Sequence, residues 1–160
     1  MTYLGAFAII LAVFMAWRCY SLYLGDELSH TRVLLRALRS YRERMKCYLE
    51  SPSEWARGYD DELLEASGFI GALKGGESLL AAYKSTKDGL YITGACDEII
   101  EGCFERLGDG YLDTELEVME SAIGGVECEE KRLSEDISRR KRVAGALLGA
   151  LAVGVVILII

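Results

Sequence analysis

The final thirty residues, 131–160, read KRLSEDISRRKRVAGALLGALAVGVVILII, and they decide how the rest of the chain is interpreted. Residues 143–160 contain no charged or polar side chain and no proline. At ~1.5 Å rise per residue this run gives a helix of roughly 27 Å, close to the hydrocarbon thickness of a bilayer. A helix on the surface of a soluble domain has a polar face, whereas this one is apolar all round. We therefore expect residues 143–160 to form a transmembrane helix.

A second apolar run, YLGAFAIILAVFMAW, lies near the N-terminus at residues 3–17. A secretory signal peptide would need a basic start and small residues before a cleavage site. Met1 and Thr2 offer no charge, and Trp17-Arg18-Cys19 is a poor cleavage site. The sequence predicts an uncleaved transmembrane helix over residues 3–23.

Basic residues border both apolar runs on the side that faces the middle of the chain. By the positive-inside rule, residues 24–142 are then expected in the cytoplasm, between two membrane helices. The predicted protein is a two-pass protein of the cell membrane, with membrane lipid among its partners. The basic residues that set this topology are Arg18, Arg139, Arg140, Lys141 and Arg142.

The charge of the chain excludes some classes of partner. The formal net charge is −7, so no basic groove for nucleic acid is indicated. Residues 32–46 carry six cations and one anion, whereas residues 50–130 carry five cations and twenty acidic residues. For the basic segment two interpretations remain open: attraction to anionic lipid, or ion pairing with acidic helices packed beside it.

The periodicity of apolar residues predicts an all-α fold, a small bundle of about six helices. Ser51-Pro52-Ser53-Glu54 is a capping box that starts a helix, which we expect to continue to Ala66. Asp26 or Ser29 is expected to cap the helix before it. A heptad stripe marks the last helix, and we expect that helix to run without a break into the terminal apolar run; the stripe consists of Leu112, Leu116, Met119, Ile123, Val126, Leu133 and Ile137.

No pattern of catalytic or ligand-binding residues emerges from the sequence. The chain contains no glycine-rich phosphate loop, no GxSxG and no HExxH, and His30 is its single histidine. The five cysteines form no CxxC and are interpreted as small buried thiols in a reducing compartment. We therefore expect a protein without enzymatic activity, cofactor, metal or small-molecule substrate. In the terminal run, Gly145, Gly149 and Gly154 are spaced for close helix packing in lipid.

The turn before the last helix carries the most specific motif, FERLGDGYLDTELE at residues 104–117. With this motif, and with Tyr48 followed by Ser51-Pro52, the whole chain resembles the stage III sporulation protein AB family. That family has a segment LGYLDxEMQ here, which Tyr111, Leu112, Asp113 and Glu115 match. Asp109 replaces the leucine before the glycine of the family motif, Glu117 replaces its glutamine, and Ser53 stands where the family has leucine.

The resemblance implies a platform component of the secretion-like channel complex between mother cell and forespore. The family's helical domain is similar to that of the inner-membrane platform proteins of type II secretion. A cytoplasmic secretion-type ATPase and other membrane subunits would be its partners, on the mother-cell side of the membrane around the forespore. The motif supplies candidate docking residues, namely Gly108, Asp109, Gly110, Tyr111, Asp113 and Glu115. The alternative is a membrane-tethered adaptor unrelated to sporulation, and for the turn itself the alternative is a purely structural role with Asp113 capping the helix.

Overall fold

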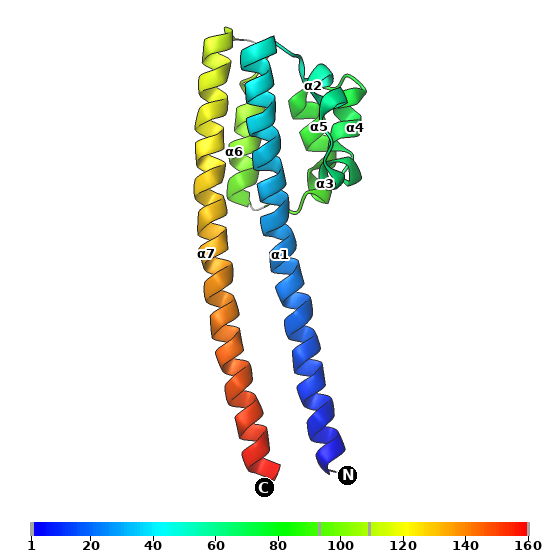
Figure 1. Cartoon of the computed structure of the whole chain (residues 1–160), viewed down its shortest axis with the longest axis vertical. Coiled ribbons are helices and arrows are strands. Elements are labelled where there is room, and N and C mark those ends of the chain that lie inside the picture. Colours follow the sequence, from blue (N-terminus) through cyan, green and yellow to red (C-terminus); the bar gives the residue numbers. More distant parts are fainter. Residues whose placement is uncertain (1, 93, 109, 160) are drawn as a thin grey trace. The chain divides into compact units, whose positions relative to one another are not determined.

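Helices make up all the regular structure in the part of the chain that the structure describes, which confirms the predicted all-α class (Figure 1). The computed structural model describes the backbone of residues 2–92, 94–108 and 110–159; side chains are left undescribed at residues 2–10, 13, 23–24, 151–153 and 155–159. The elements are α1 (Thr2–Tyr48), α2 (Pro52–Gly58), α3 (Glu62–Ala66), α4 (Phe69–Lys74), α5 (Leu79–Thr86), η1 (Lys87–Gly89), α6 (Gly94–Glu105) and α7 (Leu112–Ile159).

The chain divides into two compact units, and the larger one, Glu27–Lys131, is here called the core domain. The smaller unit consists of Met1–Asp26 and Arg132–Ile160. The helices α1 and α7 contribute to both units because neither is interrupted where the units meet. The predicted continuous helix from residue 112 into the terminal apolar run is therefore confirmed as far as Ile159.

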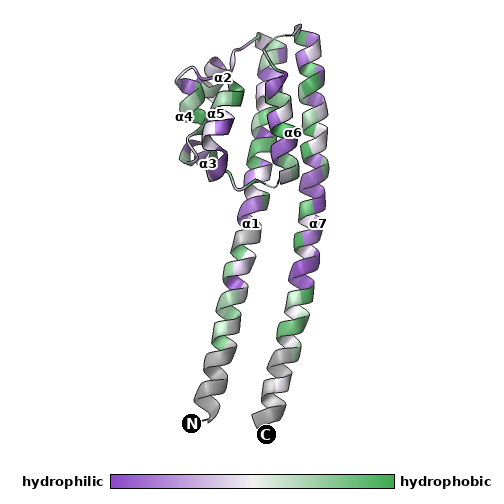
Figure 2. Cartoon of the chain, turned by 180° about the vertical axis from the view of Figure 1, so that it is seen from behind, coloured by the Kyte–Doolittle hydropathy of each residue, from purple (hydrophilic) through white to green (hydrophobic). Residues whose placement is uncertain are grey.

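One hydrophobic core holds the core domain together. Its largest fully buried side chains lie on α1, α3, α4, α5, α6 and α7 and at Leu90, and they include Tyr83, Phe69, Leu34, Leu64, Ile70, Leu73, Leu90, Ile100, Met119 and Val126. Hydrophilic and hydrophobic residues are mixed along α6 and along the upper parts of α1 and α7, as expected of amphipathic helices (Figure 2). Burial of each such side chain contributes about 1.5–3 kcal/mol, so the core supplies the main favourable term for folding.

The start of α2 follows the sequence prediction in every detail. Ser51 Oγ accepts from the Glu54 amide at 3.4 Å, and the Glu54 carboxylate accepts from the Ser51 amide at 2.8 Å. The two bonds satisfy amides that a helix start otherwise leaves unpaired. Trp55 Nε1 then donates to Ser40 Oγ at 3.1 Å, which attaches α2 to α1.

The predicted end of this helix at Ala66 is wrong, since α2 ends at Gly58 and α3 begins at Glu62. The backbone of Tyr59 is extended, and Asp61 Oδ1 accepts from the amide of Leu63 at 3.1 Å and that of Leu64 at 3.4 Å. The Asp61 carboxylate therefore starts a new helix, which the periodicity of the apolar residues did not reveal.

The predicted caps before the basic helix are also wrong. Asp26 and Ser29 lie inside α1, which is helical from Thr2 to Tyr48. Without proline in this segment, nothing stops the helix between the first apolar run and the basic segment. The helix ends only after Tyr48, where Leu49 has a left-handed φ of 57° and its amide donates to the Met45 carbonyl at 3.1 Å.

The two predicted transmembrane helices, at residues 3–23 and 143–160, are corrected by the structure. Among its described residues, the chain has no helix that is both long and apolar enough to cross a membrane. Within the two predicted spans, side chains are described only at residues 11–12, 14–22, 143–150 and 154. The remaining parts of both predicted spans lie outside the described side chains. The predicted two-pass location in the cell membrane, with a cytoplasmic middle, is corrected by the same finding.

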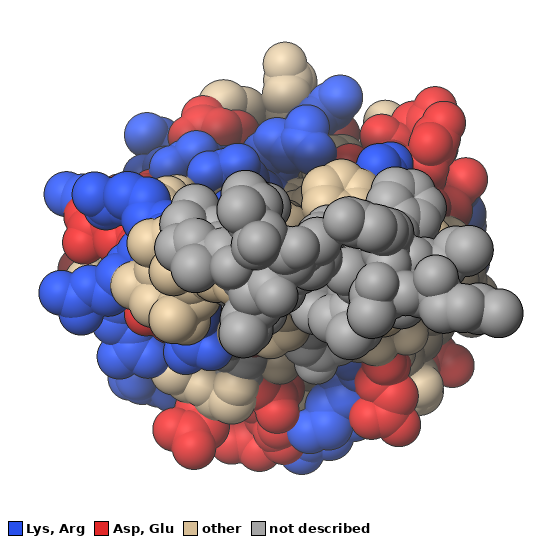
Figure 3. Space-filling model, turned by 90° about the horizontal axis from the view of Figure 1, so that it is seen from below, with Lys and Arg blue, Asp and Glu red and all other residues tan. Residues whose placement is uncertain are grey.

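The basic face of α1 is ion-paired with α7, which favours the second of the two interpretations left open by the sequence. Arg32 Nε lies 2.6 Å from Glu130 Oε1, and Arg39 Nη2 lies 2.5 Å from Glu127 Oε1. Further along the two antiparallel helices, Arg42 pairs with Glu120. The predicted acidic surface is correspondingly less uniform than the sequence suggested. On the face seen in Figure 3, blue side chains gather toward the left with red ones among them.

Candidate functional site

A groove of about 500 Å³ opens on the core domain where several helix ends come together. It is called the end groove below. Residues from four parts of the chain line it: Tyr41, Met45 and 49–52 at the end of α1 and the start of α2; 78–80 at the start of α5; Phe104, Glu105, Leu107 and Gly108 at the end of α6; and Leu112 and Glu115 on α7. This volume lies in the range of about 300–1,000 Å³ that is typical of ligand sites.

The floor of the end groove is apolar. Tyr41, Leu79 and Phe104 are buried, and Met45 lies beside them at 5% exposure. Leu80, Leu107 and Leu112 are only partly buried, so they form walls that remain accessible to solvent. An apolar side chain entering the groove would therefore lose contact with water on several sides.

Three carboxylates line the groove, contributed by Glu50, Glu105 and Glu115. No lysine, arginine or histidine occurs among the described residues that line it. Burial, and secondly the negative charge of Glu115, raises the pKa of the Tyr41 phenol to about 12. The charged side chains among the described residues that line the groove are therefore all carboxylates.

The turn between α6 and α7 is built around Glu115. Its Oε1 accepts from the amide of Gly108 at 2.9 Å and from the amide of Gly110 at 3.4 Å. Gly108 has a φ of 111°, a conformation that side chains with a Cβ rarely adopt. The motif at residues 104–117 thus makes a defined turn, in which a glutamate and a glycine have structural roles.

The other predicted docking residues are placed as follows. Tyr111 is 87% exposed and is followed by the first helical residue of α7. Asp113 is exposed in the first turn of that helix, and the expectation that it caps the helix is wrong, because the helix begins one residue before it. Gly110 is exposed beside Glu115, and Asp109 lies outside the described residues. The turn therefore brings Gly108 and Glu115 into the end groove and places Tyr111 next to it in sequence.

The predicted packing glycines have no neighbours among the described residues. A Cβ atom added at Gly145, Gly149 or Gly154 would meet nothing within 4 Å. The topology-setting arginines are also exposed, and Arg140 donates to Asp136 Oδ2 at 2.7 Å and to Tyr20 Oη at 3.5 Å. Arg18, Arg139, Lys141 and Arg142 lie on the same two helices. Their predicted role depended on the two membrane spans.

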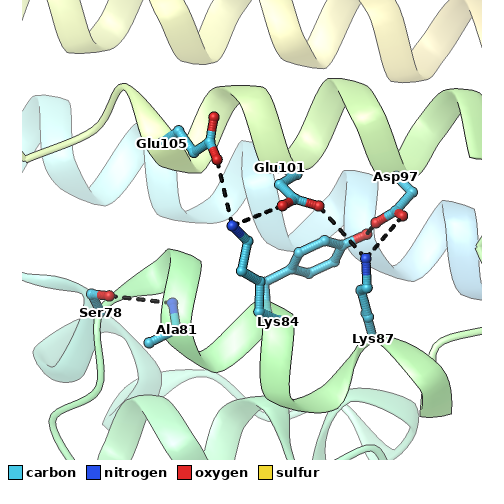
Figure 4. A network of polar contacts seen from close by, with 8 residues as sticks. Ser78, Ala81, Lys84, Lys87, Asp97, Glu101 and Glu105 are labelled. Carbon is cyan, nitrogen blue, oxygen red and sulfur yellow. Dashed lines mark hydrogen bonds and ion pairs between the residues drawn. The ribbon is translucent and has the colours of Figure 1, made fainter.

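A second polar cluster joins α5 and η1 to α6 (Figure 4). Lys84 Nζ lies 2.8 Å from Glu101 and 3.4 Å from Glu105, while Lys87 Nζ lies 3.3 Å from Asp97. Hydrogen bonds to these carboxylates raise the pKa of both lysines, so the amines stay protonated and are poor nucleophiles.

The buried end of this cluster is Tyr83, whose hydroxyl donates to Asp97 Oδ1 at 2.8 Å. Burial first, and the bond to Asp97 second, raise the pKa of Tyr83. Each charged side chain here has a partner of opposite charge. We therefore interpret the cluster as a structural link that holds α5 and η1 against α6, and not as a reactive site.

The cysteines divide into two groups. Cys96 and Cys103 are buried, as predicted, and burial raises the pKa of the Cys103 thiol to about 11. Cys19, Cys47 and Cys128 are exposed, so the prediction of buried thiols is wrong for these three. Where residues are described, no three His, Cys, Asp or Glu side chains gather to hold a metal ion.

The sequence predicted two of the segments that line the end groove, but it did not predict that they lie together or that α1, α5 and α6 complete the groove. The start of α2 and the turn before α7 were recognised by their capping and glycine signals. Tyr41, Leu79 and Phe104 lie on three different helices, and no pattern along the sequence places them together. The one local signal was the apolar residue Leu49 directly after a helix end, which is 71% exposed.

Comparisons with models of protein families, with curated proteins and with solved structures found no match to this chain. The resemblance to the sporulation family therefore stays a prediction from the motif.

Proposed function

We propose that this protein is a non-catalytic assembly component that docks another protein at the end groove and the adjoining turn. The observation that carries this proposal is the groove itself, an apolar depression on an otherwise charged domain. Apolar depressions beside exposed aromatic residues are the usual anchoring points of protein interfaces. Tyr111, with its largely exposed ring, supplies such an aromatic residue next to the groove.

The class of partner follows from the resemblance to the stage III sporulation protein AB family. We take a secretion-type ATPase of the channel complex between mother cell and forespore as the partner to be tested. An assembly component needs no chemistry of its own, because it acts by holding other subunits in register. The paired lysines of the α5–α6 cluster are consistent with such a role, since protonated amines in ion pairs contribute rigidity.

The proposal is tested by the binding of the full chain to the secretion-type ATPase encoded in the same genome. We expect Tyr111→Ala to weaken binding by roughly tenfold or more, as exposed interface tyrosines commonly do. Tyr91→Ala is the matched control, because Tyr91 is also an exposed tyrosine at 59% and lies between η1 and α6, outside the turn before α7. Binding is measured by biolayer interferometry, and thermal unfolding verifies that both variants are folded.

Two outcomes would contradict the proposal. If the wild-type chain binds the ATPase and both tyrosine variants bind equally well, docking takes place elsewhere on the molecule. If the wild-type chain does not bind, the partner class is wrong, and an adaptor unrelated to sporulation becomes the better explanation.

A further inference from the structure

The chemistry of the end groove restricts what can occupy it. Its floor accepts an apolar group, because Tyr41, Leu79 and Phe104 are buried beneath it. Its volume of about 500 Å³ suits a few large side chains, and is too small for a folded element to be enclosed. The occupant is therefore expected to be a short segment that inserts one or two side chains.

The charges around the groove favour a basic segment. Glu50 and Glu105 each form one ion pair. Glu50 Oε1 lies 3.1 Å from Arg44 Nη1, and Glu105 Oε1 lies 3.4 Å from Lys84 Nζ. A carboxylate has about four acceptor positions, so each of these two keeps free positions for a cation from outside. Neither Arg44 nor Lys84 is among the residues that line the groove, so the charged side chains of its described lining are all carboxylates.

The helix starts beside the groove do not reverse this preference. A helix start attracts anions through unpaired amides. Here Ser51 Oγ accepts from the Glu54 amide, Ser78 Oγ accepts from the Ala81 amide at 3.2 Å, and Glu115 occupies the amides of the turn before α7. Because these donors already have acceptors within the chain, an anionic ligand would find little to bind.

We propose that the end groove binds a protein segment that places an apolar side chain over Tyr41 and Phe104 and a Lys or Arg against Glu50 and Glu105. This inference rests on the proposed docking function and specifies the chemistry of the partner. The apolar contact supplies affinity, whereas the charges orient the segment and speed its association.

The inference is tested with synthetic fluorescent peptides of about 15 residues, a length at which amphipathic helices begin to form. The first peptide contains leucine and lysine at helical spacing. The second replaces every lysine with glutamate, and the third replaces every leucine with serine. Binding to the full chain is followed by fluorescence anisotropy at low and high salt.

We expect the leucine–lysine peptide to bind, and the other two to bind roughly tenfold more weakly or worse. Glu105→Gln should weaken binding of the leucine–lysine peptide about threefold and reduce its dependence on salt, because one carboxylate no longer attracts the cation. Glu98→Gln is the matched control, an exposed glutamate on the same helix that does not line the groove.

The apolar contact has its own pair of variants. Leu80→Gln should weaken binding of the same peptide at least about fivefold, since Leu80 forms a partly exposed wall of the groove. Leu63→Gln is its control, because Leu63 is partly buried against the same core and does not line the groove. Similar unfolding midpoints for the two variants would separate loss of contact from loss of stability.

Equal binding of the basic and acidic peptides would overturn the inference, and so would equal effects of Leu80→Gln and Leu63→Gln. If the full chain self-associates in analytical ultracentrifugation and Glu105→Gln abolishes this, the occupant is a basic segment of a second copy, and a separate partner is excluded. A different measurement tests the proposed function. That function is contradicted if Tyr111→Ala and Leu80→Gln both leave binding of the ATPase unchanged.

Discussion

At the scale of single residues, one carboxylate decides where a helix begins. Asp61 accepts from the amides of Leu63 and Leu64, and its other oxygen lies 3.6 Å from Arg36 Nη2. The side chain thus starts α3 and connects it to α1. Periodicity alone had merged α2 and α3, since apolar residues continue at helical spacing across Tyr59 and Asp60.

We expect Asp61→Ala to lower the free energy of unfolding by about 1 kcal/mol, the usual cost of removing a capping side chain. The ion pair with Arg36 adds little, because Arg36 is largely exposed. Urea unfolding followed by circular dichroism measures the change. Glu62→Ala, one residue further along the same helix, is the control, and an equal loss in both variants would contradict the capping role.

At the scale of elements, Gly125 of the Gly124-Gly125 pair lies where α7 passes close to Ile99 of α6. A Cβ at Gly125 would lie 3.2 Å from Ile99 Cδ1 and 3.3 Å from Ile99 Cγ2, whereas a Cβ at Gly124 would meet nothing within 4 Å. Ion pairs between α1 and α7 hold the other side of α7. A side chain at position 125 would therefore press against α6, whereas position 124 has room for one.

Alanine at these two positions should have different effects on stability. Gly124→Ala is expected to stabilise the protein by up to about 1 kcal/mol, because alanine is the better helix former and has space there. Gly125→Ala should gain less or destabilise, because Ile99 must move to admit the methyl group. Thermal unfolding of the two variants checks this order, and a larger gain for Gly125→Ala would show that α6 and α7 are not in close contact.

At the scale of the whole molecule, burial of weak acids makes stability depend on alkaline pH. The pKa of Tyr41 is raised from 10.0 to about 12 and that of Cys103 from 9.0 to about 11, in both cases mainly by burial. Tyr83 shifts in the same direction. The folded state therefore keeps protons that the unfolded state releases above pH 9 to 10, so stability falls as the pH rises.

We expect the free energy of unfolding to fall by a few kcal/mol between pH 8 and pH 11, at roughly 1.4 kcal/mol per unit of pKa shift for each group. Tyr41→Phe should reduce this fall, because the phenol no longer ionises in the unfolded state. Urea titrations at several pH values measure it. A flat profile up to pH 11 would contradict the burial of these groups.

The sequence by itself determined the features that depend on neighbouring residues. It predicted the all-α class, the capping box at Ser51, the turn before α7 and the continuity of the last helix. It did not reveal the break at Asp61, and its two membrane spans are not supported by the described residues. Capping and turn formation are local, because the interacting groups lie within a few residues of one another.

The tertiary structure alone decided the end groove and the ion pairs of the basic helix. Tyr41, Leu79 and Phe104 come from three helices, and each looks like a core residue until their packing leaves an opening between them. Arg32 and Glu130 are 98 positions apart, yet α1 and α7 bring them to within 2.6 Å. Such arrangements depend on how helices pack, and the order of residues along one helix does not contain that information.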